Sequence, residues 1–366
     1  MIKSQDAKGT IKTVEELIDR GFVKPDTKDT LELVSSRYSV AITPAIADLI
    51  DPTDPADPIA LQFVPQARET HHQPSENADP ISDEKMTKTP GLVHRYRDRV
   101  LLKLVDICPV YCRFCFRREM VGPKPDQHPQ GQLSEADLMS AMSYISNHKD
   151  VWEVIITGGD PFVLAPRRIQ DVVERINAID HVKVVRWHTR VPCVAPNLIT
   201  EQLIDALKSS NKTNYVALHA NHVRELTDGA REACQCLIDR GIPMVSQTVL
   251  LRGINDNSTT LAELMRAFVE TGIKPYYLHH ADLAPGTSHF RTTIAEGQAI
   301  MQELRETLSG LAQPTYVLDV PGGSGKVPAH AAHVEAKPNN PNSYGIKDAK
   351  GGQHEYNDCC VPAKSA

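Results

Sequence analysis

The sequence predicts an α/β fold, a partial barrel built from six strand–helix units, written (β/α)6. From Arg99 onward, short runs of apolar and β-branched residues alternate with stretches of helical periodicity. Most successive runs start roughly 30 residues apart, the size of one strand–helix–strand step. Strands that alternate with helices pair in parallel through right-handed crossovers. Six units are fewer than the eight of the closed barrel, in which site residues follow the carboxyl ends of the strands.

The predicted strands are short apolar runs, at residues 100–107, 154–157, 182–187, 215–218, 243–250 and 276–279. The predicted helices each follow one strand, at residues 135–147, 167–179, 200–207, 224–240, 260–271 and 295–308. Ser134 is placed to cap the first of these helices, with Asp137 three residues later. The core domain is therefore expected to span residues 96–320.

The flanks of this core differ in composition. Residues 1–95 contain short helical patterns at 14–20 and 31–34, but prolines at the density seen in 51–58 interrupt helices. We expect an irregular and partly helical segment that lies over the core. Residues 321–366 contain a glycine-rich loop and a polar tail, expected to form loop or to be ordered by a neighbouring subunit.

Composition limits the class of protein. The chain has 366 residues, 41% of them hydrophobic, which is enough for a large core. Its net charge of −6 lacks the basic footprint of a nucleic-acid-binding protein. It has no run of 18 apolar residues to span a membrane, and the first residues lack the apolar centre of a secretory signal. A cytoplasmic protein without nucleic-acid or membrane partners is expected.

Three of the eight cysteines are clustered. Cys108, Cys112 and Cys115 follow the first core strand with the spacing C-x3-C-x2-C. In a chain without a secretory signal, such clusters favour metal binding over disulfides. Three thiolates on one short loop can hold a [4Fe–4S] cluster and leave one iron open. Zinc is the alternative, but structural zinc sites use four ligands and no second cysteine pair lies nearby.

Lys326 ends the glycine-rich loop. Enzymes that use pyridoxal 5′-phosphate (PLP) need a lysine for the Schiff base. A phosphate-binding loop of the G-x4-G-K-[ST] type is excluded, because Val320 replaces its first glycine and Val327 its serine or threonine. Taken alone, Lys326 would be read as a solvated loop residue.

The cysteine cluster, together with Gly158-Gly159-Asp160 at the end of the second strand, resembles the radical S-adenosylmethionine (SAM) superfamily. The resemblance implies that the open iron chelates SAM, and that Gly158, Gly159 and Asp160 belong to the SAM site. Glycines allow the close backbone approach that such a contact requires.

Residues 94–328 resemble the lysine 2,3-aminomutase family. The matching stretches are 98–102, 247–256, 274–277, 289–292 and 319–326. The resemblance implies that Lys326 carries PLP, that Arg99 binds its phosphate, and that Gln247 is also a cofactor-binding residue. It also implies that Arg117 holds the substrate α-carboxylate, for which the planar guanidinium suits two parallel hydrogen bonds.

The implied reaction is a radical 1,2-amino shift that converts L-lysine to β-lysine, catalysed by an isomerase. Asp282 and Asp319 match the family's two aspartates that bind the side-chain ammonium, a buried cation that needs opposite charge. The resemblance further implies an electron donor such as flavodoxin or ferredoxin, and a homo-oligomer.

Three alternatives stay open at this point. One is a relative that makes β-lysine for elongation factor P, and another is glutamate 2,3-aminomutase, which Asp282 and Asp319 disfavour. The third is an iron–sulfur or PLP-binding regulator without activity. A zinc site present in some members is not expected, because Asn257 replaces its first cysteine and the tail ends in only Cys359-Cys360. His279 and His280 lie beside Asp282 at a strand end, where packing or contact with solvent is weighed at least as highly as lining the pocket.

Overall fold

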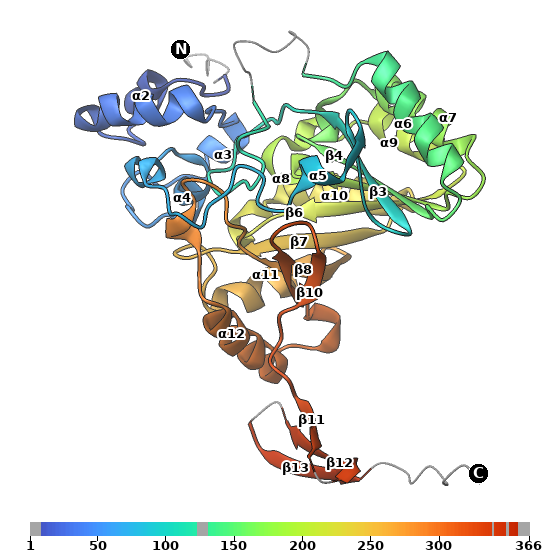
Figure 1. Cartoon of the computed structure of the whole chain (residues 1–366). Coiled ribbons are helices and arrows are strands. Elements are labelled where there is room, and N and C mark those ends of the chain that lie inside the picture. The colour runs from blue at the N-terminus through green and yellow to red at the C-terminus, as the bar shows by residue number, and fades with distance from the viewer. Residues whose placement is uncertain (1–8, 123–130, 339, 349–350, 358–366) are drawn as a thin grey trace.

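The computed structural model describes residues 9–122, 131–338, 340–348 and 351–357. Its centre is a ten-stranded sheet in which the strands follow one another in chain order, from β1 at one edge to β10 at the other (Figure 1). The seven inner strands pair in parallel and are β3 (Arg99–Val105), β4 (Glu153–Gly158), β5 (Val184–Thr189), β6 (Thr213–His219), β7 (Met244–Leu250), β8 (Ile273–His280) and β9 (Thr315–Val320). The predicted partial barrel is thereby confirmed.

Antiparallel strands border this parallel array. β1 (Thr87–Thr89) and β2 (Leu92–Tyr96) precede it, and β10 (Gly325–Pro328) follows β9 at the opposite edge. The sequence did not indicate β1 and β2, since they are short and lie in the segment read as irregular.

One major helix follows each of the strands from β3 to β8. These helices are α6 (Glu135–Asn147), α7 (Pro166–Asn177), α9 (Glu201–Lys208), α10 (Asp228–Asp239), α11 (Ser258–Glu270) and α12 (Ile294–Thr307). All six predicted helices are present. Helix α10 begins four residues later than predicted because Thr227 caps it, and residues 223–225 form a separate 3-10 turn.

The helices pack on the sheet through apolar stripes. In α7 the buried residues are Ile169, Val172, Val173 and Ile176, the spacing of one helical face. In β4, Val154, Ile155 and Ile156 are all buried, as expected for a strand of a parallel sheet that is covered on both faces.

The N-terminal segment lies over one end of the barrel (Figure 1). Its helices are short and are α1 (Val14–Asp19), α2 (Lys28–Arg37), α3 (Pro44–Ala47), α4 (Pro58–Phe63) and α5 (Asp83–Met86). Buried ion pairs join it to the barrel: Glu76 binds Arg291 at 2.7 Å, and Glu69 binds two arginines beside the clustered cysteines. The segment is therefore fixed against the loop that carries the clustered cysteines.

The described part of the tail is not loop, contrary to the expectation. β11 (Val334–Lys337), β12 (Asn340–Lys347) and β13 (Gln353–Asn357) form a separate antiparallel sheet that projects from the barrel in Figure 1. Its polar sequence lacks the apolar face by which strands are recognised, which is why it read as loop. Cys359 and Cys360 lie outside the described residues. Within the described ranges, no helix has the length and apolar character to cross a membrane.

Candidate active site

The curved sheet encloses a cavity of about 250 Å³. Its lining comes from strands β2 to β10, from the loops that follow β3, β4, β5, β6 and β8, and from Ile81 before β1. All twelve residues predicted for the site line this one cavity: Arg99, Cys108, Cys112, Cys115, Arg117, Gly158, Gly159, Asp160, Gln247, Asp282, Asp319 and Lys326. The structure thus brings together residues spread over more than half of the chain.

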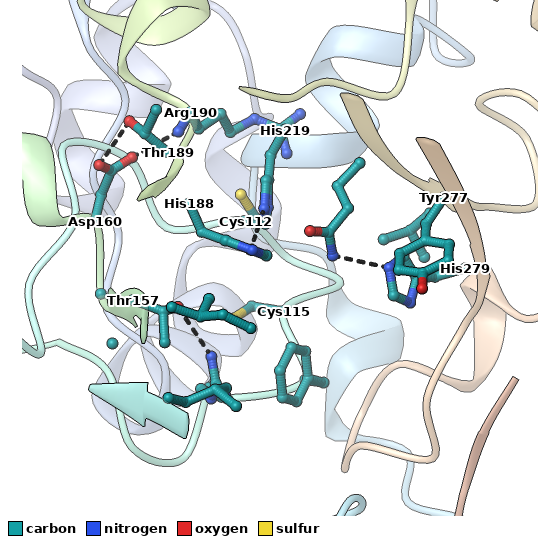
Figure 2. A pocket seen from close by; sticks show the side chains of 18 of the residues that line it. Cys112, Cys115, Thr157, Asp160, His188, Thr189, Arg190, His219, Tyr277 and His279 are labelled. Atoms are coloured by element: carbon teal, nitrogen blue, oxygen red, sulfur yellow. Dashed lines mark hydrogen bonds between the residues drawn. The ribbon is translucent and has the colours of Figure 1, made fainter. Parts of the chain in front are cut away.

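The three clustered cysteines lie on the loop after β3 and line the cavity. Figure 2 shows two of them, Cys112 and Cys115. Burial raises the pKa of each thiol, that of Cys112 to about 11. The raised pKa values mean that forming the thiolates costs free energy. A bound metal would offset this cost, because a thiol that coordinates a metal is deprotonated. Among the residues that the structure describes, no three potential ligands converge on a single metal ion. Three cysteines on one short loop are a ligand set that would hold an iron–sulfur cluster and leave one iron open.

Gly158 and Gly159 are required by close packing against the loop that carries the cysteines. A Cβ at Gly158 would lie 2.1 Å from the carbonyl oxygen of Val105, and a Cβ at Gly159 would lie 2.1 Å from that of Ile107. Gly158 also has φ +122°, which favours glycine. Any side chain here would displace the backbone directly before Cys108.

Asp160 ties the ends of β4 and β5 together. Its carboxylate accepts hydrogen bonds from the Thr189 hydroxyl at 2.8 Å and from the Arg190 backbone N–H at 2.7 Å (Figure 2). Burial raises its pKa, and these hydrogen bonds partly offset that rise. In this structure the carboxylate shapes the site through the loop that it holds.

The sequence analysis missed a buried arginine beside the cysteines. The Arg190 guanidinium donates to Glu225 at 2.5 Å and to Gln62 at 2.8 Å. It lines the cavity together with Cys112, whose thiolate its charge would favour. Its only sequence signal is its place directly after β5, at the edge where site residues gather.

A histidine pair was missed as well. His188 on β5 and His219 on β6 line the cavity with their rings 3.2 Å apart, from Nδ1 to Nε2 (Figure 2). Burial is the largest cause that lowers both pKa values, that of His219 to about 3. Both rings are therefore neutral at physiological pH, and the buried Nε2 of His188 has no partner within the described structure.

Lys326 lies on β10, at the opposite edge of the sheet from β2, and still contacts Tyr96 at the end of β2. Its backbone N–H donates to the Tyr96 hydroxyl at 2.7 Å, and its Nζ lies 3.0 Å from Asp319 Oδ1. The Arg99 guanidinium lies 3.7 Å from the centre of the Tyr96 ring. The predicted PLP lysine and the predicted phosphate-binding arginine are thus joined through one tyrosine, which the sequence did not single out.

Arg117 is paired with a carboxylate from the N-terminal segment. Its Nε and Nη2 donate to Asp83 Oδ2 at 3.0 and 2.8 Å, and its Nη1 lies 3.3 Å from the Thr157 hydroxyl. Asp83 is buried, and although burial raises its pKa, the charge of Arg117 lowers it overall. The Asp83 pairing fixes the direction of the Arg117 fork at the cavity wall.

The two predicted substrate aspartates differ in charge. Burial and the nearby charge of Asp319 raise the pKa of Asp282 to about 7. Burial acts the same way on Asp319, but a hydrogen bond from His279 and the charge of Lys326 bring its pKa down to about 2. Two carboxylates that share a buried site repel each other when both are ionised. A cation bound between them would remove that repulsion and allow Asp282 to ionise as well.

The lining carries six arginine or lysine residues against three aspartates, an excess that suits ligands with carboxylate and phosphate groups. His279 belongs to this lining and His280 does not. His280 instead bonds the Tyr316 hydroxyl at 2.8 Å. The question that the sequence left open is thus answered differently for the two histidines.

Comparisons with known proteins agree with this geometry. Residues 102–265 match the family model described as the radical SAM superfamily. The chain is 38% identical to the L-lysine 2,3-aminomutase of Clostridium subterminale, over 88% of this chain and 76% of that protein. It is 33% identical to the L-lysine 2,3-aminomutase of Buchnera aphidicola, over 86% of this chain and 91% of that protein. It is also 33% identical to the glutamate 2,3-aminomutase of Clostridioides difficile, over 85% of this chain and 72% of that protein.

Proposed function

Because the chain belongs to the lysine 2,3-aminomutase family of the radical SAM superfamily, we propose that it is an isomerase that converts L-lysine to β-lysine. One observation carries the proposal. The cavity that holds the three cysteines and the PLP lysine candidate, Lys326, also holds a pair of aspartates, Asp282 and Asp319, able to accept a cation. A diamino acid supplies that cation, and its α-carboxylate suits the excess of arginine.

The residues that would hold the cofactors all line the one cavity. Cys108, Cys112 and Cys115 would ligate a [4Fe–4S] cluster, the Gly158–Asp160 turn would border SAM, and Gln247 would be a further cofactor-binding residue. Lys326 would carry PLP, with Arg99 at its phosphate. When bound, the cluster with SAM supplies the radical that takes a hydrogen atom from the substrate, and PLP supplies the group that carries the migrating nitrogen.

The chain's own residues bind and orient the substrate. Arg117 would hold the α-carboxylate, since its fork is already fixed by Asp83. Asp282 and Asp319 would hold the side-chain ammonium at the other end. The distance between the Arg117 guanidinium and these carboxylates would then select a substrate with the length of lysine. Fixing both ends presents one C–H bond to the radical.

The same walls would limit the access of water to the site. The N-terminal segment closes over the cluster loop with Glu69, whose side chain is fully buried between Arg113 and Arg118. A dry site protects a radical from side reactions.

Glutamate is a poorer fit than lysine. Its side-chain carboxylate would face Asp319, which is held ionised, and like charges in a buried site repel. The reaction proposed is the same whether β-lysine is released or is made for elongation factor P, so the physiological pathway is outside the proposal. A reductant protein such as flavodoxin or ferredoxin, a homo-oligomer and a cytoplasmic, reducing location are part of the proposal.

The test is reconstitution without oxygen. The protein is loaded with iron, sulfide and PLP, given SAM, a reductant and L-lysine, and the products are separated and identified by mass spectrometry. β-Lysine is expected, and it should require both SAM and Lys326. The control is K326A, which should retain its iron and lose both the PLP absorbance and the product.

No β-lysine from a preparation with a full cluster and bound PLP would overturn the assignment. L-Glutamate is then the first alternative substrate, followed by other amino acids.

A further inference from the structure

His279 is a cavity residue that the proposed function does not use. It lies near the end of β8, between Gln247 on the neighbouring strand β7 and Asp319 on the neighbouring strand β9. The Gln247 amide nitrogen is 2.8 Å from His279 Nε2, and His279 Nδ1 is 3.5 Å from Asp319 Oδ2. Figure 2 shows the His279 ring beside Tyr277, with the first of these hydrogen bonds drawn to it.

These contacts determine which ring nitrogen carries the proton. Burial is the main cause that lowers the pKa of His279, so the ring is neutral and has one donor. A carboxylate faces Nδ1, and a lone pair there would be repelled, so Nδ1 carries the hydrogen. Nε2 then accepts from the Gln247 amide, which is the orientation that the structure has.

Asp319 is thus placed between two donors. Lys326 Nζ is 3.0 Å from Oδ1, and His279 Nδ1 is 3.5 Å from Oδ2. When Lys326 carries PLP, its Nζ is taken up by that bond and no longer serves as a free ammonium. While Lys326 is held in that bond, His279 is the nearer donor that remains on Asp319, and Arg95 Nη1 lies 3.9 Å from Oδ1. The histidine contact also persists when the substrate amine replaces Lys326 on PLP and frees its Nζ.

We propose that His279 is a positioning residue that holds the Asp319 carboxylate in place for the side-chain ammonium of the substrate, and so determines the preference for a diamino acid. The inference rests on the proposed function and assigns to His279 part of its substrate selection. It predicts that loss of the Nδ1 donor weakens recognition of the ammonium and leaves the rest of the site intact.

The test compares L-lysine with L-norleucine, which lacks only the terminal ammonium. Affinities are measured from the change in PLP absorbance on PLP-loaded protein. Wild type is expected to prefer lysine, and H279F should reduce that preference by about tenfold or more, as for a lost hydrogen bond to a charged group. In turnover assays, H279F should raise the KM for L-lysine by a similar factor and lower kcat by less than about threefold.

Matched variants separate this role from simple packing. H279N keeps an amide N–H near the position of Nδ1, whereas H279Q keeps one near Nε2. H279N should retain most of the lysine preference, and H279Q should behave like H279F. All variants should keep the PLP spectrum and iron content of the wild type.

Two results would overturn the proposal: an unchanged lysine-to-norleucine ratio in H279F, or equal losses in H279N and H279Q. A wild type that binds both ligands equally would instead contradict the lysine assignment, and with it this role of His279.

Discussion

The Tyr96 hydroxyl accepts a hydrogen bond from the backbone N–H of Lys326 at 2.7 Å. Tyr96 is the last residue of β2, near one edge of the sheet, and Lys326 lies on β10 at the opposite edge. The contact therefore joins the two edges of a sheet that does not close into a complete barrel. The same tyrosine ring supports the Arg99 guanidinium. One side chain thus sets the distance between the proposed PLP lysine and the proposed phosphate-binding arginine.

Removing that hydroxyl should weaken PLP binding. Y96F keeps the ring beneath Arg99 and loses one hydrogen bond, worth about 1 kcal/mol. We expect about a fivefold weaker affinity for PLP, measured by titration at the absorbance of the bound cofactor. Y96L removes the ring as well and should lose more. Equal PLP affinity in wild type and Y96F would show that the contact does not position Lys326.

The pKa of Asp282 predicts how lysine binding depends on pH. Its value of about 7 means that the carboxyl is neutral below that pH and charged above it. A substrate ammonium favours the charged form, so the KM for L-lysine should rise as pH falls below about 7, by up to about tenfold per pH unit. The measurement is KM from about pH 6 to about pH 8. In D282N the KM for L-lysine should be high at every pH in this range and should no longer depend on pH. If D282N keeps the same pH dependence, another group is responsible for it.

The buried carboxylate of Glu69 should be needed to hold the cluster loop. It binds Arg113 Nη2 at 2.7 Å and also Arg118, on either side of Cys115. E69Q leaves two buried arginines without a counter-charge, which should cost about 3 kcal/mol of stability and reduce the iron bound per chain. The control is E76Q, which breaks the Glu76–Arg291 pair, whose carboxylate is also buried and whose arginine lies outside the loop that carries the cysteines.

We expect E76Q to lower the unfolding temperature and to keep its iron. Comparable loss of iron in both variants would mean that general stability, and not the cluster loop, is affected.

The free energy of unfolding at acidic pH should depend on the Glu69 carboxylate. The two arginines lower the pKa of Glu69 in the folded protein, although burial acts to raise it. Its contribution to the free energy of unfolding is therefore present above the ordinary glutamate pKa and is lost as pH falls through the lowered folded value. E69Q should flatten this part of the stability curve, measured by denaturant unfolding at a series of acidic pH values. A parallel curve in E69Q would contradict this assignment.

A methyl group at Gly159 should disturb the cluster loop. Its Cβ would lie 2.1 Å from the backbone oxygen of Ile107, next to Cys108, so the loop must move. G159A should bind less than half of the wild-type iron, measured by iron assay after reconstitution. G310A is the control, because nothing lies within 4 Å of the added atom there. Full iron in G159A would show that the loop can shift without cost to the cluster.

Local sequence signals predicted the barrel and the three-cysteine cluster, whereas the roles of the other site residues were predicted from the family resemblance. The strands and helices are visible in the sequence as alternating apolar runs and stretches of helical periodicity. The three cysteines from Cys108 to Cys115 lie close together in the sequence, on one loop. Parallel pairing then places every strand end at one edge, so residues as distant as Gly158 and Asp282 were expected together. Capping at Thr227 shifted α10, a detail that apolar periodicity does not encode.

The tertiary structure alone decided which of these groups touch. The pairing of Glu69 with Arg113, of Asp83 with Arg117 and of Tyr96 with Lys326 joins segments whose sequences show no mutual pattern. Likewise, the sequence named Asp282 and Asp319 as a pair, but only burial and the neighbours of each decide which one is ionised. Sequence periodicity reports burial along one element, whereas contact and charge depend on the elements packed around it.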